Sequence, residues 1–377
     1  MNITVIEANM TGLQHSVINR LILNMLNSMV DVKKIRLYCS SSHYSALSIK
    51  NLEKIDYHEI SVLEPGKKRI KKFFLEYFQT KNILKSNNDD LYLLLSCFPN
   101  VHYFLSKASK KLKDKKLLIV THGEAEGLVM KGKWKIWSYP FWITKTFKHL
   151  EKDHFYRLVL GNSILMNLKK LGYHKRLFSI EHPYEDFKEY NNVIPQKGKN
   201  IFGYIGNCLK TKGGETFITA ANKNAFFWIV GIYALKNTNL NENIKILSNR
   251  NKMLSFQEFN NYVDALTYAC YPYPSESYKF TASGAVFDAL KHLKPIIYIK
   301  NDYFDEILNS AGDIGYRCEN EQEFIETVQK LSLNDDFVQY EEQVRNLRNL
   351  QGKFTWQNIK SDFEKIIKQI IEKDCYE

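Results

Sequence analysis

The sequence predicts an α/β protein of two domains, each built on a parallel β-sheet with helices on both faces. Short runs of consecutive apolar residues alternate with stretches of helical periodicity, a pattern typical of parallel strands that are buried on both sides. The pattern stops near residue 185 and begins again at residue 201. The length of 377 residues fits two domains, because one domain usually has about 100–200 residues.

The first domain is expected to span residues 1–184. A loop with Gly12 follows its first strand, and helical periodicity follows at residues 16–29. Its strands are predicted at Ile3–Glu7, Ile35–Cys39, Leu91–Leu95, Leu117–Thr121, Arg157–Gly161 and Leu177–Glu181.

The second domain is expected to span residues 199–356, after a polar linker at 185–200 that has no periodicity. Apolar residues at helical spacing from Trp356 to about Lys373 predict a closing amphipathic helix. The strands of this domain are predicted at Ile201–Ile205, Phe226–Gly231, Lys245–Leu247, Thr267–Tyr271 and Pro295–Ile299. Its helices are predicted at Glu215–Lys223, Phe256–Ala265, Ser283–Leu290 and Glu321–Leu331.

The composition is that of a folded globular protein, with 44% hydrophobic and 25% charged residues. No run of about 18 apolar residues predicts a transmembrane helix, and the first residues lack the pattern of a signal peptide. The six cysteines have wide, irregular spacing, which argues against a zinc site or a disulfide scaffold. We therefore expect a cytoplasmic protein with incidental thiols.

The charge is distributed unevenly along the chain. Residues 1–190 contain 31 Lys and Arg against 18 Asp and Glu, a net charge of +13, whereas residues 191–377 contain 22 against 23, a net charge of −1. Such asymmetry indicates that one domain faces an anionic partner: a membrane surface, a nucleic acid or an acidic substrate.

Several catalytic motifs are absent from the sequence. There is no G-x-G-x-x-G after the first strand and no G-x-x-x-x-G-K-[ST], which disfavours dinucleotide binding and P-loop phosphoryl transfer. There is also no G-x-S-x-G, H-E-x-x-H or D-x-D. The nearest acidic pairs, Asp89 with Asp90 and Asp302 with Asp305, have weak spacing for a catalytic metal.

His122 is the strongest catalytic candidate in the first half. It follows the apolar run at residues 117–120, so it is expected at the carboxyl end of a strand, where an imidazole can exchange a proton near neutral pH. Glu124 or Glu126 could orient it or supply charge. The alternative is a surface-loop histidine without a role.

An anion site is the strongest candidate in the second half. A strand ends at a proline-bounded loop with Glu276 and Lys279, and the small residues Ala282, Ser283 and Gly284 open a helix. Exposed N–H groups at a helix N-terminus bind anions, and small side chains let a phosphate approach. Further candidates are Asp288, whose carboxylate could accept ribose hydroxyls, and the loop residues Asn207, Lys210 and Lys212. The alternative is a capped helix with a buried small-residue face.

Taken in order, these segments resemble the GT-B nucleotide-sugar glycosyltransferases of the "glycosyl transferases group 1" type. The resemblance covers nearly the whole chain and is clearest in residues 201–358. It is carried by the Gly206 strand end, the Lys212-Gly213 pair, the run from Phe287 to Ile297 and the Phe354-Thr355-Trp356 entry to the last helix.

The resemblance implies two Rossmann-like domains that face an interdomain cleft, with the helix at 357–377 packed back on the first. It implies that Gly12 approaches the donor diphosphate, that His122 lies near the transferred sugar, and that Lys210 or Lys212 binds the diphosphate. Asn207 stands where many members have Arg, and Asp288 stands at the ribose-binding position. Ala282, Ser283 and Gly284 would offer backbone N–H groups to the diphosphate.

One departure from the family concerns its paired glutamates. The first of the pair falls here at Phe280, and Glu276 lies four residues earlier. The stereochemistry of transfer, retaining or inverting, therefore stays open.

The implied function is a glycosyltransferase that moves a sugar from a nucleotide diphosphate sugar to a glycan or lipid-linked acceptor, in surface polysaccharide synthesis of the bacterial type. No metal and no cofactor is expected, because helix N-termini and cations can hold the leaving diphosphate. The alternatives are a noncatalytic GT-B-like partner subunit, a sugar-nucleotide epimerase, or a basic nucleic-acid-binding protein. The last lacks a recognisable reader motif, so no nucleic-acid partner is expected.

Two basic segments of the first half are interleaved with aromatic residues, at Lys67–Lys72 and Lys131–Lys148. Cations with Trp, Phe and Tyr are typical of segments that lie at a membrane interface. We therefore expect peripheral contact with an anionic membrane surface, at the inner face of the membrane. The alternative is a solvated helix face over core aromatics.

Overall fold

The computed structural model describes residues 1–49, 53–64, 69–130, 138–149, 154–185, 195–236, 240–248, 253–333 and 336–372. The chain forms two compact units. The first comprises Met1–Glu185, Phe280–Ala282 and Phe354–Glu377, and the second comprises Asp186–Lys279 and Ser283–Lys353. Most of the predicted linker, like Lys67, Lys68 and the predicted basic residues at 131–135, lies outside the described residues.

The first unit is built on a seven-stranded parallel sheet with the order β3-β2-β1-β4-β5-β6-β7. Most of its strands are short apolar runs buried on both faces, as the continuous patterns predicted. The strands are β1 (Asn2–Glu7), β2 (Lys34–Cys39), β3 (Ile55–Glu59), β4 (Leu91–Leu94), β5 (Leu117–Thr121), β6 (Tyr156–Leu160) and β7 (Leu177–Ile180).

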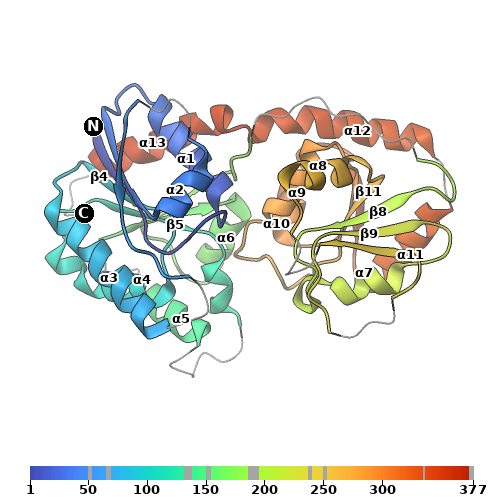
Figure 1. Ribbon diagram of the computed structural model, residues 1–377, viewed down its shortest axis with the longest axis horizontal. Coiled ribbons are helices and arrows are strands. Elements are labelled where there is room, and N and C mark those ends of the chain that lie inside the picture. The colour runs from blue at the N-terminus through green and yellow to red at the C-terminus, as the bar shows by residue number, and fades with distance from the viewer. Residues whose placement is uncertain are drawn as a thin grey trace. The chain divides into compact units, whose positions relative to one another are not determined.

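Two hydrophobic cores cover the two faces of this sheet. Val5 points into the core shared with α1 and α13, whereas Ile6 points into the core shared with α3 and α4. Figure 1 shows α13, in red, beside α1. The helices of this unit are α1 (Ser16–Ser28), α2 (Ser41–Leu47), α3 (Arg69–Ser86), α4 (Pro99–Ala108), α5 (Tyr139–His149), α6 (Asn162–Lys170) and α13 (Trp356–Glu372), with short 3-10 turns at Ser109–Lys111 and Glu124–Leu128.

The second unit contains a six-stranded parallel sheet with the order β10-β9-β8-β11-β12-β13. Its strands are β8 (Ile201–Ile205), β9 (Phe226–Ile232), β10 (Ile244–Ser248), β11 (Tyr268–Tyr271), β12 (Ile296–Ile299) and β13 (Gly315–Cys318). Figure 1 shows α8 and α9 over one face of this sheet, and α7 and α11 over the other. The helices are α7 (Gly214–Ala220), α8 (Phe256–Asp264), α9 (Gly284–Lys291), α10 (Asp302–Leu308), α11 (Glu321–Ser332) and α12 (Phe337–Gln351), with a 3-10 turn at Lys210–Lys212.

Each sheet has a point at which the order of its strands reverses. In the first unit this point lies between β1 and β4, and in the second it lies between β8 and β11. Loops that leave neighbouring strands there diverge to opposite faces, so ligands of open α/β sheets bind outside the carboxyl ends of these strands. The topology therefore directs attention to the residues that follow β1, β4, β8 and β11.

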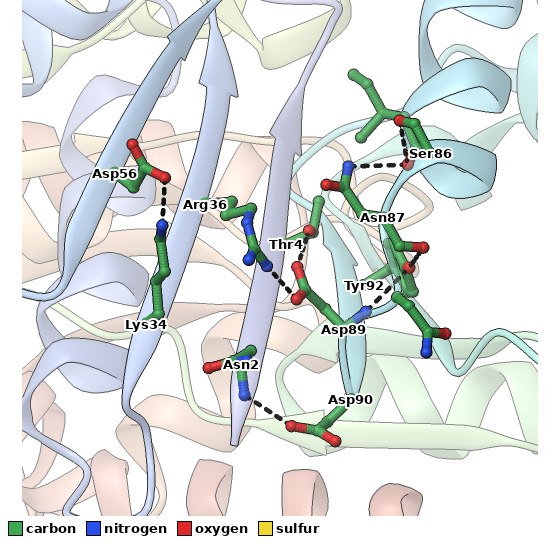
Figure 2. Close-up of polar contacts among 12 residues, drawn as sticks. Asn2, Thr4, Lys34, Arg36, Asp56, Ser86, Asn87, Asp89, Asp90 and Tyr92 are labelled. Carbon is green, nitrogen blue, oxygen red and sulfur yellow. Dashed lines mark hydrogen bonds and ion pairs between the residues drawn. The ribbon is translucent and has the colours of Figure 1, made fainter.

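The opposite end of the first sheet is held by a polar cluster around Asp89 (Figure 2). Arg36 pairs with Asp89, whose side chain is almost fully buried, and the Thr4 hydroxyl donates to the same carboxylate. The backbone N–H of Asn2 donates to Asp90 at 2.7 Å. These contacts tie the amino ends of β1, β2 and β4 together, so Asp89 and Asp90 are accounted for as structural residues.

The predicted α/β class and the predicted strands and helices are confirmed, with some elements missed. The sequence analysis gave no residue ranges for the strands β3 and β13 or for the helices α2 to α6, α10 and α12. Both missed strands lie at a sheet edge and are partly exposed, so neither carries a continuous apolar run. The helix predicted to run to Lys223 ends at Ala220.

None of the helices within the described part of the chain is long and apolar enough to cross a membrane. Five of the cysteines, at positions 39, 97, 208, 270 and 318, are free and buried, while Cys375 lies outside the described residues. Burial raises the pKa of these thiols, which keeps them protonated and poorly reactive.

Candidate functional site

A buried carboxylate organises the carboxyl ends of β1 and β4 in the first unit. Glu7 is fully buried, and its Oε1 accepts the backbone N–H groups of Asn9 and Met10, both at 3.0 Å. The hydroxyl of Ser96, two residues beyond β4, donates to the same oxygen at 2.6 Å. A buried charge is tolerated when several donors surround it, so Glu7 fixes the start of both loops.

The loop after β1 is attached to α2 at its glycine. His43 Nδ1 lies 2.9 Å from the Gly12 carbonyl oxygen, and the Gly12 N–H donates to Ser42 Oγ at 3.4 Å. Gly12 has φ +52, a conformation in which glycine carries no Cβ penalty. The sequence analysis found Gly12 but missed Glu7 and His43. A signal for Glu7 was present, because it is the one ionisable residue in an otherwise buried strand.

His122 lies at the carboxyl end of β5, as predicted. Its Nε2 is 2.7 Å from the Leu95 carbonyl oxygen, and since a carbonyl only accepts, Nε2 carries the proton. Nδ1 of the neutral ring is then left with a lone pair. The ring also contacts that of His15, with centroids 4.3 Å apart. Burial lowers the pKa of His122, which favours the neutral imidazole.

Glu124 contacts the backbone beside His122 instead of its ring. Its Oε2 accepts the N–H of His122 at 2.7 Å and that of Gly123 at 3.1 Å, so it closes the turn after β5. Desolvation raises the pKa of Glu124. Glu124 therefore meets the backbone that carries the imidazole, and its part in catalysis stays a prediction.

Phe280, the departure from the family pattern, is buried in the first unit. Its backbone N–H donates to Glu126 Oε1 at 2.9 Å. Ala282 belongs to the same unit and packs against the core that contains β1. By contrast, Ser283 and Gly284 belong to the second unit, so the three small residues predicted to act together divide between the units.

In the second unit, the carboxyl ends of β8 and β9 lie close to the start of α9. A Cβ on Gly231 would lie 2.1 Å from the Gly206 carbonyl oxygen, and a Cβ on Gly206 would lie 3.6 Å from Ala285 Cβ. The hydroxyl of Tyr271, the last residue of β11, donates to the Ala285 carbonyl at 2.6 Å. The point at which the strand order reverses is therefore next to the first turn of α9.

The N-terminus of α9 has an open approach. Ser283 occupies the N-cap position and is buried, yet its Oγ has no hydrogen-bond partner among the described residues and makes no cap. A Cβ on Gly284 would meet no atom within 4 Å. Because the first N–H groups of a helix have no partner inside it, this turn presents donors and one unpartnered hydroxyl at the end of the sheet.

The predicted lysines differ in their surroundings. Lys210 is exposed, and its ammonium group pairs with the carboxylate of Glu215 at 2.9 Å. Lys212 instead lies over two tyrosine rings, with Nζ 5.8 Å from the ring centre of Tyr273 and 5.5 Å from that of Tyr278. Such cation–π contacts place the ammonium group without a carboxylate partner being needed.

Glycine permits this arrangement of Lys212. The following residue, Gly213, has φ +69, and a Cβ there would lie 1.7 Å from the Pro272 carbonyl oxygen. The loop after β8 thus packs against the loop after β11. The Tyr204 hydroxyl adds a hydrogen bond to the Lys212 carbonyl at 2.8 Å.

The other predicted residues of this unit are present at the same end of the sheet. Lys279 pairs with Glu276 at 2.6 Å, and the Glu276 side chain is largely exposed. Asn207 is exposed two residues after the end of β8, and Asp288 is half-buried inside α9. Among the described residues, no group of three or more His, Cys, Asp and Glu side chains could hold a metal ion.

No family model matches the sequence, and no curated protein matches it significantly. The structure is similar to sucrose-phosphate synthase from Thermosynechococcus elongatus, with a TM-score of 0.70 and 11% identity over 98% of this chain and 99% of that one. The Anabaena protein HepE, solved in complex with UDP-glucose, has a TM-score of 0.65 and 10% identity over 98% and 100%. WaaG, a glycosyltransferase involved in lipopolysaccharide biosynthesis, has a TM-score of 0.63 and 12% identity over 97% and 99%.

The chain has the GT-B fold. The two parallel sheets, each with its reversal of strand order, are the units of that fold. In this GT-B chain the predicted residues form two groups at strand ends. Gly12, His122 and Glu124 belong to the first unit, and Ser283, Gly284 and the lysine-bearing loops belong to the second.

Proposed function

We propose that this chain is a glycosyltransferase that moves a sugar from a nucleotide diphosphate sugar to a glycan or lipid-linked acceptor, without a metal ion. The observation that carries the proposal is the first turn of α9, which lies beside the end of β8 and begins with the buried, unpartnered Ser283 hydroxyl. A buried hydroxyl without a partner costs free energy, and a bound phosphate oxygen would satisfy it.

The residues of the second unit suit the leaving group of such a transfer. As the glycosidic bond to the donor breaks, negative charge builds on the diphosphate oxygens. The N–H groups of α9 and the Ser283 hydroxyl would stabilise that charge, and Lys212 and Lys279 would add positive charge. Asp288, one turn further along α9, would accept the ribose hydroxyls. Asn207 and Glu276 are proposed as further donor contacts.

The residues of the first unit would act on the sugar and its acceptor. The neutral ring of His122 has one lone pair, on Nδ1, because Nε2 is bonded to a backbone carbonyl. That lone pair can accept a proton or a hydroxyl hydrogen bond during transfer. The proposed role of Glu124 is to hold the turn that presents this ring, through the N–H groups that it binds.

The similar structures support this choice of substrates. HepE was solved with UDP-glucose, and WaaG acts in lipopolysaccharide biosynthesis. We therefore propose a uridine nucleotide sugar as the first donor to test, and surface polysaccharide synthesis as the process.

The anion site can be tested by binding, without knowledge of the acceptor. Thermal unfolding would be followed with UDP, GDP, ADP and CMP and their sugars, because a ligand of the native state raises the unfolding temperature. One nucleotide diphosphate is expected to stabilise the chain. Absence of stabilisation by every nucleotide and every sugar nucleotide would contradict the proposal.

An added negative charge at Gly284 separates binding from folding. Gly284→Asp places a carboxylate at the helix N-terminus, which stabilises a helix by about 0.3–1 kcal/mol. The same carboxylate would repel a diphosphate, so the variant should fold as well as the wild type and lose its response to nucleotide. Gly284→Asn is the neutral control and should keep most of the response. An unchanged response of Gly284→Asp would contradict the site.

We also propose peripheral contact with an anionic membrane, through α3. Ile70, Phe74 and Phe78 are 61%, 49% and 51% exposed and lie one turn apart, so they form one apolar ridge. Lys71 and Lys85 are exposed on the same helix. An apolar ridge among cations is the pattern that inserts between lipid headgroups.

Aromatic side chains from the three helices α3, α4 and α5 pack together next to this ridge. Phe73 of α3 contacts Phe104 of α4 at 5.3 Å between ring centres, and Phe104 contacts Trp142 of α5 at 5.8 Å.

The structure corrects one residue of the predicted patch. Lys72 is buried, and its Nζ donates to the Asn9 carbonyl at 2.7 Å, so it is not part of the surface.

Co-sedimentation with vesicles tests the membrane contact. The wild type should bind phosphatidylglycerol vesicles and release from them as salt is raised, because cations contribute about 1 kcal/mol each near an anionic surface. The double variant Phe74→Ser, Phe78→Ser should bind several-fold more weakly. Val338→Ser, which changes a residue of α12 that is 76% exposed, is the matched control. Equal binding by both variants would contradict a role of α3.

A further inference from the structure

Four side chains link the end of β1 to the glycine of the loop that follows it. Glu7 Oε2 accepts from Asn19 Nδ2 at 3.1 Å, and the same Asn19 nitrogen lies 3.0 Å from His43 Nε2. His43 Nδ1 is 2.9 Å from the Gly12 carbonyl oxygen, while Ser42 Oγ accepts the Gly12 N–H. Glu7, Asn19 and His43 are all fully buried, so water does not compete for these bonds.

These bonds determine the protonation state of the imidazole. The Gly12 carbonyl only accepts, so His43 Nδ1 must carry a proton. The Asn19 amide donates to the Glu7 carboxylate, which also only accepts, and its second N–H is directed at His43 Nε2. Nε2 is therefore the unprotonated acceptor, and His43 is held as one neutral tautomer. A buried carboxylate thus specifies, through an amide and a ring, which nitrogen donates to Gly12.

The same loop contains His15, whose position depends on that glycine. Gly12 has φ +52 and His15 has φ 54, so the chain turns twice through the left-handed region within four residues. His15 has no side-chain cap bond to α1, and its ring contacts that of His122. A Cβ on Gly12 would meet nothing within 4 Å, so at this residue the loop is held by its bonds to His43 and Ser42.

We propose that His43 is a positioning residue of the transferase reaction. Through its bond to the Gly12 carbonyl it holds the loop in the conformation that meets the donor substrate, and Asn19 and Glu7 hold His43 in the tautomer that makes this bond. The inference rests on the proposed function, because the approach of Gly12 to the donor diphosphate is what the resemblance to the GT-B glycosyltransferases implies. Loss of the bond should weaken the binding of donor more than the chemical step.

Two isosteric substitutions separate the two nitrogens. In His43→Asn the amide nitrogen takes the place of Nδ1, so the bond to Gly12 is kept and the bond to Asn19 is lost. In His43→Gln the amide takes the place of Nε2, so the bond to Asn19 is kept and the bond to Gly12 is lost. If the site only required a buried polar residue, the two variants would behave alike. If His43 positions Gly12, only His43→Gln should lose function.

Donor kinetics give the first measurement. His43→Gln and His43→Ala should raise the KM for the nucleotide sugar about five- to tenfold, the usual effect of one lost hydrogen bond, while kcat changes by less than about twofold. His43→Asn should stay within about twofold of the wild-type KM. Ser45→Ala, at an exposed site on the same helix, is the control. Equal KM values for the Asn and Gln variants would overturn the proposal.

Amide hydrogen exchange of residues 8–16 gives a second measurement that does not depend on activity. His43→Gln should speed exchange in this segment and leave the segment around Asp89 unchanged, whereas His43→Asn should leave both unchanged. If the wild type transfers no sugar, the proposed function fails, and the exchange data still decide whether His43 holds the loop. Unchanged exchange in His43→Gln would overturn that part on its own.

Discussion

Arg157 donates two hydrogen bonds to one nitrogen of His102, from Nε at 3.1 Å and from Nη2 at 3.0 Å. Both side chains are buried, and Arg157 also donates to the carbonyl of Phe155 and to the hydroxyl of Ser106. Because a guanidinium only donates, Nε2 of His102 must be unprotonated. Burial, and then the charge of Arg157, lower the pKa of His102 well below its ordinary value.

The first prediction follows from this lowered pKa. Above an unfolded pKa of about 6.5, His102 is neutral in both states and the contact is complete. Below this pH, His102 binds a proton in the unfolded chain but not in the folded chain, so the free energy of unfolding decreases as the pH is lowered. His102→Gln keeps an acceptor without a proton to gain. Its free energy of unfolding should therefore decline less below about pH 6.5, by up to about 1.4 kcal/mol per pH unit. If urea titrations show that the wild type and His102→Gln lose the same free energy of unfolding as the pH is lowered, the lowered pKa of His102 is disproved.

Glu76 should give the opposite dependence on pH. Desolvation raises its pKa to about 8, against an ordinary value of 4.5, so the folded state keeps a proton that the unfolded chain loses. Its contribution to stability is complete below about pH 4.5 and is lost as pH rises through about 8. Glu76→Gln cannot ionise and keeps an acceptor for the Phe98 N–H. The variant should match the wild type in mild acid and exceed it near pH 8.

Chemical denaturation at both pH values would measure this difference. Glu342→Gln, at an exposed position of α12, is the control and should show no such gain. A Glu76→Gln variant that is equally stable or less stable than the wild type near pH 8 would show that the buried carboxyl is not held neutral.

The cluster in Figure 2 contains its own matched pair of carboxylates. The Asp89 side chain is 2% exposed and pairs with Arg36, whereas the Asp56 side chain is 37% exposed and pairs with Lys34. Asp89→Asn should lower the free energy of unfolding by about 3 kcal/mol, because it leaves Arg36 without its partner. Asp56→Asn should lower it by less than about 1 kcal/mol. Similar losses in thermal unfolding would contradict this reading of the cluster.

Two glycines of the second unit should respond differently to alanine. Gly213→Ala places a Cβ 1.7 Å from the Pro272 carbonyl oxygen at a positive φ, so the two loops must separate. We expect a loss of about 2–4 kcal/mol in the free energy of unfolding. Gly284→Ala meets no atom within 4 Å, at the start of a helix, and should be neutral or slightly stabilising. Equal unfolding temperatures for the two would contradict the packing described for Gly213.

Much of the fold was predictable because its strands are buried on both faces. Runs such as Leu117–Thr121 have no polar alternation to obscure them, and their order along the chain predicts a parallel sheet. The edge strands β3 and β13 carry partly exposed residues, so their patterns resemble loops. Edges are the part of a sheet that local sequence describes least well.

The candidate site was predictable where residues lie in a loop that follows a strand. His122 comes directly after β5, Gly12 lies in the loop after β1, and Ser283 ends the loop after β11. His43 and Asn19 could not be found in this way, because their partners are far along the chain and their own surroundings are ordinary helix sequence. Lys72 was misplaced for a related reason: the run of basic residues suggested a surface, but Lys72 lies one turn from Glu76, on the buried side of α3.

The placement of α13 has a consequence for the order in which the chain is completed. Ile359, Phe363 and Ile367 fill the core of the first unit, although they follow the whole second unit in sequence. During translation, β8 to α12 therefore leave the ribosome before α13, so the sheet of the first unit still lacks one of the helices that cover it. The nascent chain would expose that apolar surface for the time needed to translate about half of its length. The first unit, although it is synthesised first, would therefore complete its folding last.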